Sequence, residues 1–436
     1  MLNKKNTFKK TAILLALAGA LGTQSVQAAN WLMLQGTEKA DQAPRAKVWG
    51  FAQVNYQSTD NTLLKAGPGA GGPAAFNQLA PQLTNSSGFN IQRARIGVRG
   101  ANFPLDKNVN YFLMMEMGNN GITTGGKASQ GQLTDASVTL NHFDGARVRV
   151  GLFKTPGSEE SFKGIPVFNY VNFTAATDRL LIERHFANST GDSSRTAPVG
   201  AVRDMGVQLF DSFKDGAWEH SYAVMLGNGN GLNLNDIDND KDTYLYLATE
   251  KVFGKSKGPR RQGMKFYGWH HDGKRTIDST SGNKRTRSGL GTTYFDGKYR
   301  VAAEYIIADG MIYAGTTGAR TPANGGTFTV LKDQKANGYH IDLGYRIKPN
   351  VELNVRYDKL NHATDTDANT GTNNDNKREF TTTTLGAQYF FNKKTSVRLN
   401  YELRDVTAPN APTAAPVHTI LSGVDNRLSA QLMMIF

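Results

Sequence analysis

The chain has 436 residues, 46 glycines and no cysteine. The absence of cysteine excludes disulfide frameworks, thiolate nucleophiles and zinc–thiolate sites, and it suits a protein exported through an oxidising compartment. The formal net charge of +13 raises nucleic-acid binding as a first possibility. The charged residues lie in the alternating segments described below, however, and we therefore expect no nucleic-acid partner.

The first 28 residues have the features of a secretory signal peptide. Four lysines between positions 4 and 10 precede an apolar run over 12–21, and Val26-Gln27-Ala28 supplies a small-residue cleavage site. The apolar run is too short to span a bilayer, which favours a signal peptide over a membrane anchor. We expect a mature chain over 29–436, with 46 basic and 37 acidic residues and a net charge of +9.

Apolar and polar residues alternate in many segments after position 90. Between Asn90 and Gly100, positions 94, 96 and 98 are apolar, whereas positions 93, 95 and 99 are arginine. The same period of two recurs in 109–117, 339–346, 351–358 and 397–404. Because successive side chains of a strand point to opposite faces, these segments predict a sheet with one apolar and one charged face.

The connections between the alternating segments come in two lengths. Short turns such as Asp144-Gly145 and Asp296-Gly297 alternate with long polar stretches along the chain. The long stretches cover 58–88, 155–200, 227–242, 308–337, 361–377 and 406–424. Short periplasmic turns and long external loops are typical of Gram-negative outer-membrane barrels. The sequence therefore predicts an all-β, transmembrane antiparallel barrel of about sixteen strands, an even number as such barrels require.

Two regions are patterned less clearly. Strand limits between 242 and 293 are not fixed by the alternation, and the basic connection at 255–261 is expected to be a solvated turn near lipid phosphates. The C-terminal segment is clear: residues 428, 430, 432 and 434 are apolar and the chain ends on Phe436. A terminal aromatic after an alternating strand resembles the signal that the barrel-assembly machinery reads.

The segment Ile91–Gly100, with the sequence IQRARIGVRG, resembles the second strand of the phosphate-selective porin O and P family. The resemblance continues through LTDA at 133–136 and RVGLFKTPG at 149–157, and Arg184 ends a stretch similar to the tail of the family's third loop. It covers roughly residues 49–206. The resemblance implies a sixteen-stranded barrel, usually a homotrimer, whose inward-folded third loop narrows the pore; that constriction loop is expected over 155–200.

The loop departs from the family's phosphate channels, which carry a cluster of serines and lysines there. In this chain, residues 158–164 read SEESFKG, with one lysine and two acids. The departure favours a channel for small anions in general, or a general porin, over one specific for phosphate.

If positions 94, 96 and 98 face lipid, the intervening arginines face the lumen, and the same logic turns Arg147 and Arg149 inward. An arginine facing lipid at the midplane would cost about 2–4 kcal/mol, which constrains this assignment. Lumen arginines raise the local anion concentration and offer a planar fork for phosphate or carboxylate oxygens. Alternatively, Glu116, Asp135 and the loop acids pair with the arginines in a structural lattice. The expected pore-lining residues are Arg93, Arg95, Arg99, Arg147, Arg149, Lys163, Arg179, Arg184 and Asp135.

Other chemistry is poorly supported. Asp236-Ile237-Asp238-Asn239-Asp240 lacks the glycine and the terminal glutamate of a calcium loop, and His270-His271 has no third ligand near it in sequence. We expect no catalytic residues, no metal and no cofactor. Interfacial aromatic girdles are expected from Trp49, Trp218, Tyr222, Trp269, Tyr389 and Phe391.

The sequence thus predicts an outer-membrane porin that lets small hydrophilic solutes diffuse passively, with a preference for anions, phosphate among them. The partners expected are small anions, outer-membrane lipid and two further copies of the chain. The alternatives are a general non-selective porin, an outer-membrane enzyme with its site at the barrel rim, and an adhesin.

Overall fold

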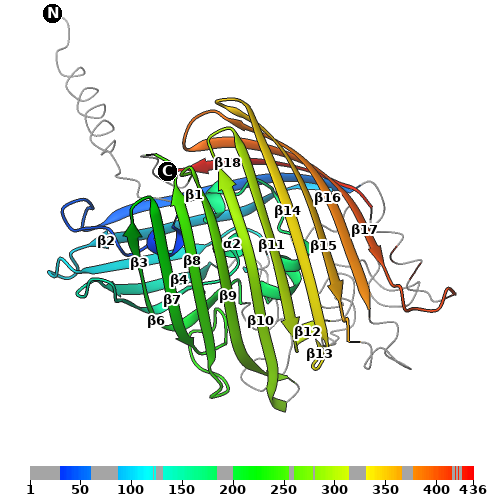
Figure 1. The fold of residues 1–436 in the computed structure, drawn as a ribbon, viewed down its shortest axis with the longest axis horizontal. Coiled ribbons are helices and arrows are strands. Elements are labelled where there is room, and N and C mark those ends of the chain that lie inside the picture. Colours follow the sequence, from blue (N-terminus) through cyan, green and yellow to red (C-terminus); the bar gives the residue numbers. More distant parts are fainter. Residues whose placement is uncertain are drawn as a thin grey trace, which may run out of the picture.

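The computed structural model describes residues 30–59, 87–120, 122–123, 131–183, 200–254, 260–277, 280–313, 330–365, 377–414, 418, 421 and 425–436. Within them, sixteen strands form one closed antiparallel barrel (Figure 1). The strands are β1 (Lys47–Thr59), β2 (Ser87–Ala101), β3 (Val109–Glu116), β4 (Gln132–Leu140), β5 (Arg147–Lys154), β6 (Arg203–Asp215), β7 (Trp218–Gly227), β8 (Asp242–Val252), β9 (Gly263–Ile277), β10 (Thr280–Phe295), β11 (Tyr299–Asp309), β14 (Lys335–Lys348), β15 (Val351–His362), β16 (Arg378–Phe390), β17 (Thr395–Thr407) and β18 (Arg427–Ile435).

Each barrel strand pairs with the next barrel strand along the chain, and the last returns to the first. In the closing pair, Phe51 of β1 lies opposite Ile435 of β18, and Thr59 lies opposite Arg427. The short strands β12 (Ile312–Tyr313) and β13 (Val330–Leu331) form a separate two-stranded sheet between β11 and β14. Closure leaves the barrel without an unpaired edge, as a lipid environment requires. The predicted fold class and strand number are confirmed.

The two faces of the wall follow the sequence alternation. On β17, Leu399 and Leu403 point outward with 49% and 44% of their surface exposed, whereas Arg398 and Asn400 are buried on the inside. On β2, Ile96 is exposed outward and Arg95 is buried inward. The apolar residues therefore face lipid and the charged residues face the lumen, as predicted.

The two ends of the barrel differ. At one end the strands are joined by tight turns, such as 216–217, 296–298 and 349–350; we call this the turn end, which faces the periplasm in barrels of this kind. At the opposite end, the loop end, lie the long connections. The weakly patterned region after residue 278 is strand β10, which begins at Thr280.

Some sequence-based interpretations of the wall are wrong. Arg261, the last residue of the basic connection 255–261, is not solvated but turned inward, and it pairs with Glu219 and Glu250. Residues 255–259 of that connection lie outside the described residues. Trp269 is 5% exposed in the middle of β9 and donates its indole N–H to Glu304 at 2.8 Å. Trp49 packs against the inward-facing Phe51. Neither tryptophan belongs to an interfacial girdle, because the alternation of side chains along each strand puts both on the lumen side.

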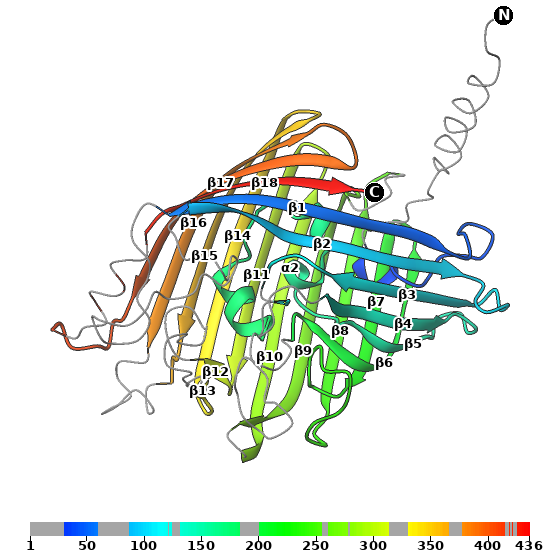
Figure 2. The same ribbon diagram turned by 180° about the vertical axis from the view of Figure 1, so that it is seen from behind.

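Four short helical segments lie apart from the wall: η1 (Trp31–Met33), α2 (Glu159–Phe162), η2 (Ile165–Val167) and η3 (Thr177–Leu181). Figures 1 and 2 show α2 within the outline of the barrel. None of the helices in the described part of the chain is long and apolar enough to cross a membrane.

Candidate functional site

The segment after β5, residues 155–183, crosses the inside of the barrel from one wall to another. Near its start, the Lys154 ammonium donates to the backbone carbonyls of Ser161 and Lys163, both at 2.8 Å. On the far wall, the side-chain oxygen of Asn400 accepts the backbone N–H of Val171 at 2.7 Å. The described part of the third loop is therefore folded inward, and we call it the crossing loop.

The crossing loop then returns toward β9 and β10. There the guanidinium of Arg287 donates to the carbonyl of Leu180 at 2.9 Å, and Arg275 and Arg285 pair with Glu183 at 2.8 and 2.7 Å. Residues of β9, β10 and β17 thus bond to the backbone of the loop and to its Glu183. The loop therefore forms a fixed obstruction across the lumen.

The two adjacent acids of the crossing loop are both paired with cations of the wall. Glu159 accepts the Lys265 ammonium at 2.5 Å and the indole N–H of Trp31 at 2.6 Å. Glu160 pairs with Arg356 at 3.1 Å. Because their charge is compensated locally, these acids do not make the adjoining space anionic.

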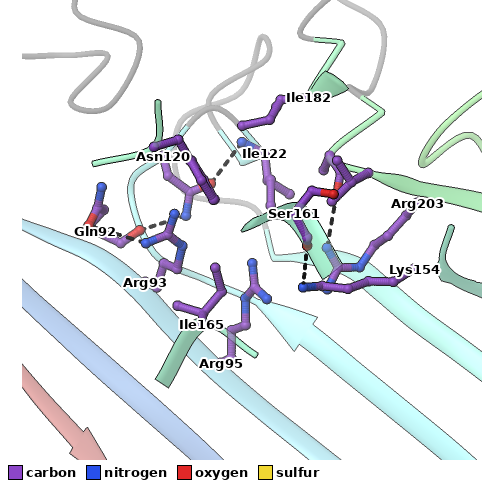
Figure 3. A pocket seen from close by; sticks show the side chains of 13 residues that line it. Gln92, Arg93, Arg95, Asn120, Ile122, Lys154, Ser161, Ile165, Ile182 and Arg203 are labelled. Atoms are coloured by element: carbon purple, nitrogen blue, oxygen red, sulfur yellow. Dashed lines mark hydrogen bonds between the residues drawn. The ribbon is translucent and has the colours of Figure 1, made fainter. Parts of the chain in front are cut away.

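Basic side chains line a pocket between the crossing loop and the strands β2, β5 and β6 (Figure 3). Arg93, Arg95, Lys154 and Arg203 supply its cations; we call it the arginine pocket. Its remaining lining residues are Gln92, Asn120, Ile122, Ser161, Ile165, Phe173, Ile182, Ala201 and Val202.

A β-bulge places Gln92 and Arg93 side by side. The register between β1 and β2 shifts after Gln53, which lies opposite Arg93, while the next residue Val54 lies opposite Ile91. Gln92 is thus the extra residue of the bulge, and its side chain is buried together with that of Arg93. The bulge concentrates polar groups where an ideal strand would turn one of them to lipid.

Two buried carboxylates lie behind the arginine pocket. Glu116 pairs with Arg95 at 2.6 Å and Asp135 pairs with Arg203 at 3.1 Å, and both carboxylates are 0% exposed. Arg93 donates to the side-chain oxygen of Gln53 at 2.7 Å and lies over the ring of Phe173 at 5.8 Å. Among the described residues, four basic side chains thus line the pocket and two buried carboxylates lie behind it.

A second pocket lies at the turn end beside β8 to β11. It carries charges of both signs, with Arg260, Lys163 and Lys265 beside Glu159 and Glu250. Ser161 and Ile165 of the crossing loop face the arginine pocket, whereas Glu159, Lys163 and Val167 face this turn-end pocket. The segment 159–167 therefore separates the two pockets.

The predicted pore-lining residues lie in different surroundings. Arg93, Arg95 and Asp135 meet at or behind the arginine pocket, as described above. Arg99 lies near the turn end, 31% exposed and 3.4 Å from Glu38. Arg147 pairs with Asp211. Arg149 is 3% exposed and donates to the carbonyls of Leu32 and Gln35.

The predicted residues of the third loop are also separated. Lys163 lines the turn-end pocket. Arg179, in η3, lies over the ring of Phe380 with its guanidinium carbon 4.0 Å from the centroid. Arg184 and the predicted signal peptide at 1–28 lie outside the described residues.

Sequence reasoning missed two of the four cations of the arginine pocket, Lys154 and Arg203. They lie at strand ends next to the long loop, where alternation gives no register. It also missed Arg398, which is 0% exposed and donates to the carbonyl of Pro166 at 2.9 Å. Its inward position follows from the alternation of 397–404, but its bond to the crossing loop depends on Pro166, which is far away in sequence.

The alternative metal sites receive no support. Among the described residues, no group of three His, Asp or Glu side chains could hold a metal ion. His270 bonds to Ser288 on the outer face at 2.7 Å, whereas His271 bonds to the carbonyl of Pro156 at 2.8 Å on the inner face. Adjacent strand residues point in opposite directions and cannot share a metal.

The acidic external segment is stabilised by an internal ion pair. Asp236 pairs with Lys241. Partial burial acts to raise the pKa of the Asp236 carboxyl, but the ammonium group of Lys241 outweighs it and holds that pKa below its usual value. The lysine thus takes the position that a bound cation would need.

Comparison with known proteins places the fold. Residues 74–179 match the family described as phosphate-selective porin O and P, within the range that the sequence resemblance covers. None of the curated proteins compared with the chain matches it.

Three solved structures share the barrel. The anion-selective porin from Comamonas acidovorans has a TM-score of 0.54 at 13% identity, covering 90% of this chain and 99% of its own. Salmonella typhi OmpF has a TM-score of 0.54 at 14% identity, covering 90% and 97%. The outer membrane channel DcaP of Acinetobacter baumannii has a TM-score of 0.53 at 13% identity, covering 92% and 100%. The chain is thus a Gram-negative outer-membrane β-barrel of the porin fold that matches the phosphate-selective porin O and P family over residues 74–179.

Proposed function

We propose that this protein is a passive, anion-preferring diffusion channel and not an enzyme. The observation that carries the proposal is the arginine pocket, in which four cations face two buried carboxylates beside the crossing loop. A similar structure is named an anion-selective porin, and the family description of residues 74–179 names phosphate selectivity.

The mechanism needs only electrostatics and positioning. A solute entering the lumen loses part of its hydration shell, and guanidinium N–H groups replace those lost hydrogen bonds for an anion but not for a cation. Because Lys154 and Arg203 face Arg93 and Arg95 across the pocket, an anion meets donors from three strands. The amide of Gln92 and the hydroxyl of Ser161 add neutral groups to the lining.

The first test is selectivity in planar bilayers under a salt gradient. The wild-type protein is expected to give stepwise currents and a reversal potential on the anion side. Arg93→Gln removes one of the basic side chains that line the arginine pocket, and it should lower the anion-to-cation permeability ratio by roughly two-fold. Lys251→Gln is the matched control, because Lys251 faces outward on β8, and it should leave that ratio unchanged.

Cation preference of the wild-type channel would contradict the proposal, and an unchanged ratio in Arg93→Gln would favour the structural lattice of ion pairs over a selectivity filter. The natural solute is a finer question. Blocking titrations with phosphate, sulfate, pyrophosphate and small carboxylates would rank the anions; the single lysine in 158–164 leads us to expect broad anion preference, not phosphate specificity.

We further propose that the channel is a homotrimer and that the terminal Phe436 serves recognition by the barrel-assembly machinery. Phe436 is 58% exposed on the outside, and its backbone N–H donates to the carbonyl of Gly50 at 3.0 Å. The aromatic ring is therefore presented outward at the seam where β18 meets β1.

A further inference from the structure

Residues 30–45, which precede β1, line the inside of the barrel at the turn end; we call them the N-terminal strap. Figure 2 shows the dark-blue turn of η1 within the barrel outline, near β3 and β7. Starting from β1, the strap passes the inner ends of β2 to β7 one after another. It is therefore a second element inside the lumen, besides the crossing loop.

Hydrogen bonds fasten the strap to successive strands. The backbone N–H of Ala101, at the end of β2, donates to the carbonyl of Pro44 at 3.2 Å. The side-chain amide of Asn110 on β3 donates to the carbonyl of Glu38 at 2.9 Å. Further along, the amide of Asn141, just after β4, donates to the carbonyl of Gly36 at 3.1 Å.

The far end of the strap reaches β7 and the crossing loop. The side-chain amide of Asn30 donates to Glu219 at 2.9 Å and to Ser221 at 2.6 Å. Trp31 donates to Glu159 of α2 at 2.6 Å and lines the turn-end pocket. Leu32 is 0% exposed and belongs to the apolar cluster that includes Phe162 of α2.

The strap also buries Arg149 and partly covers Arg99, which stays 31% exposed. Arg149 directs its guanidinium at the carbonyls of Leu32 and Gln35, and Arg99 lies 3.4 Å from the carboxylate of Glu38. Both arginines face the lumen by strand alternation, so without the strap they would be exposed to permeating ions.

We propose that the N-terminal strap is a constriction and selectivity element of the channel. It narrows the turn-end opening, seats α2 through Trp31, and screens Arg99 and Arg149 from the permeation path. This inference rests on the proposed channel function and deepens it. Displacing the strap is expected to raise both the conductance and the anion preference.

One glycine allows the strap to be displaced without changing a charge. Gly36 has a φ of +73°, and a Cβ added there would lie 2.2 Å from the hydroxyl oxygen of Thr139 on β4. Gly36→Val therefore pushes the strap from the wall. Gly216→Val is the matched control, since Gly216 has a φ of +57° in the turn between β6 and β7 and no atom within 4 Å of the added Cβ.

Single-channel recording tests the proposal. Gly36→Val is expected to raise the conductance on the order of two-fold and to shift the reversal potential further toward anions, because two arginines become accessible. Gly216→Val is expected to match the wild type. Equal conductance in the two variants would overturn the proposal.

A second measurement labels the strap chemically and uses a variant at its far end. Because the chain has no cysteine, Trp31→Cys introduces a single thiol, and a charged methanethiosulfonate added from the turn end should lower the current in discrete steps. The cysteine-free wild type serves as the control. Unchanged currents after labelling would overturn the proposal, whereas a wild-type protein that does not conduct would instead reject the channel function itself.

Discussion

At the residue scale, the arginines of the lumen differ in what compensates them. Arg95 is paired with the fully buried Glu116, which also accepts the backbone N–H groups of Ala94 at 2.9 Å and Gly118 at 2.8 Å. Arg93 is held by the amide oxygen of Gln53 and the ring of Phe173. The two neighbouring arginines are therefore held by different groups, Arg95 by a buried carboxylate and Arg93 by an amide oxygen and an aromatic ring.

Glu116→Gln tests this division. The substitution releases the charge of Arg95 into the pocket, so the anion-to-cation permeability ratio should rise, and the loss of a buried pair should lower the free energy of unfolding by about 3–5 kcal/mol. Bilayer reversal potentials and denaturant titration measure the two effects. Asp106→Asn, in the exposed turn after β2, should change neither. A ratio that falls in Glu116→Gln would show that Arg95 does not reach the permeation path.

At the element scale, the crossing loop is held mainly by side chains of the wall that donate to its backbone carbonyls. Lys154 bonds to the carbonyls of α2, Arg398 to that of Pro166 and Arg287 to that of Leu180. Each donor bonds to a carbonyl in the last turn of a short helical segment, where the helix itself supplies no donor, and an unsatisfied buried acceptor costs roughly 1–3 kcal/mol. The position of the loop is therefore set by the wall side chains that donate to its backbone carbonyls.

Arg398→Met should loosen this attachment. The carbonyl of Pro166 and the amide oxygens of Gln388 and Gln431 lose their donor, so we expect larger fluctuations of the open-channel current together with a stability loss of roughly 1–3 kcal/mol. Lys107→Met, at an exposed side chain in the turn between β2 and β3, is the control for loss of charge. Current noise equal to that of the control would argue that Arg398 does not position the loop.

At the scale of the whole molecule, the barrel depends on the division between the lipid face and the lumen. Ile341 and Ile347 lie on the same outward face of β14 and are 46% and 47% exposed. Ile341 is near the middle of the strand and Ile347 is near its turn end. The two residues therefore differ in depth within the membrane, and Ile347 also lies at a register shift between β14 and β15.

Ile341→Arg should destabilise the folded barrel by about 2–4 kcal/mol, whereas Ile347→Arg should cost about 0–1 kcal/mol, since the penalty for a charge facing lipid falls toward the interface. Equilibrium unfolding of the protein reconstituted in lipid vesicles gives both values. Equal costs at the two positions would contradict the placement of β14 across the bilayer.

The faces of the strands and their number followed from the sequence, because the position of a strand side chain is fixed by its parity along the chain. The assignment of Leu399 and Arg398 to opposite faces of the wall requires only their adjacent positions in the sequence. The interpretation was wrong where an aromatic residue was assigned from its type and not from its parity, as for Trp269, whose parity places it inside.

The sequence by itself thus determined the barrel, its apolar exterior and the inward direction of Arg93 and Arg95. Only the tertiary structure decided which cation meets which anion: Lys265 with Glu159, Arg203 with Asp135, and Arg149 with the carbonyls of the N-terminal strap. Alternation is a local property of neighbouring residues, whereas these partners are brought together by closure of the barrel and by two segments that fold into its lumen.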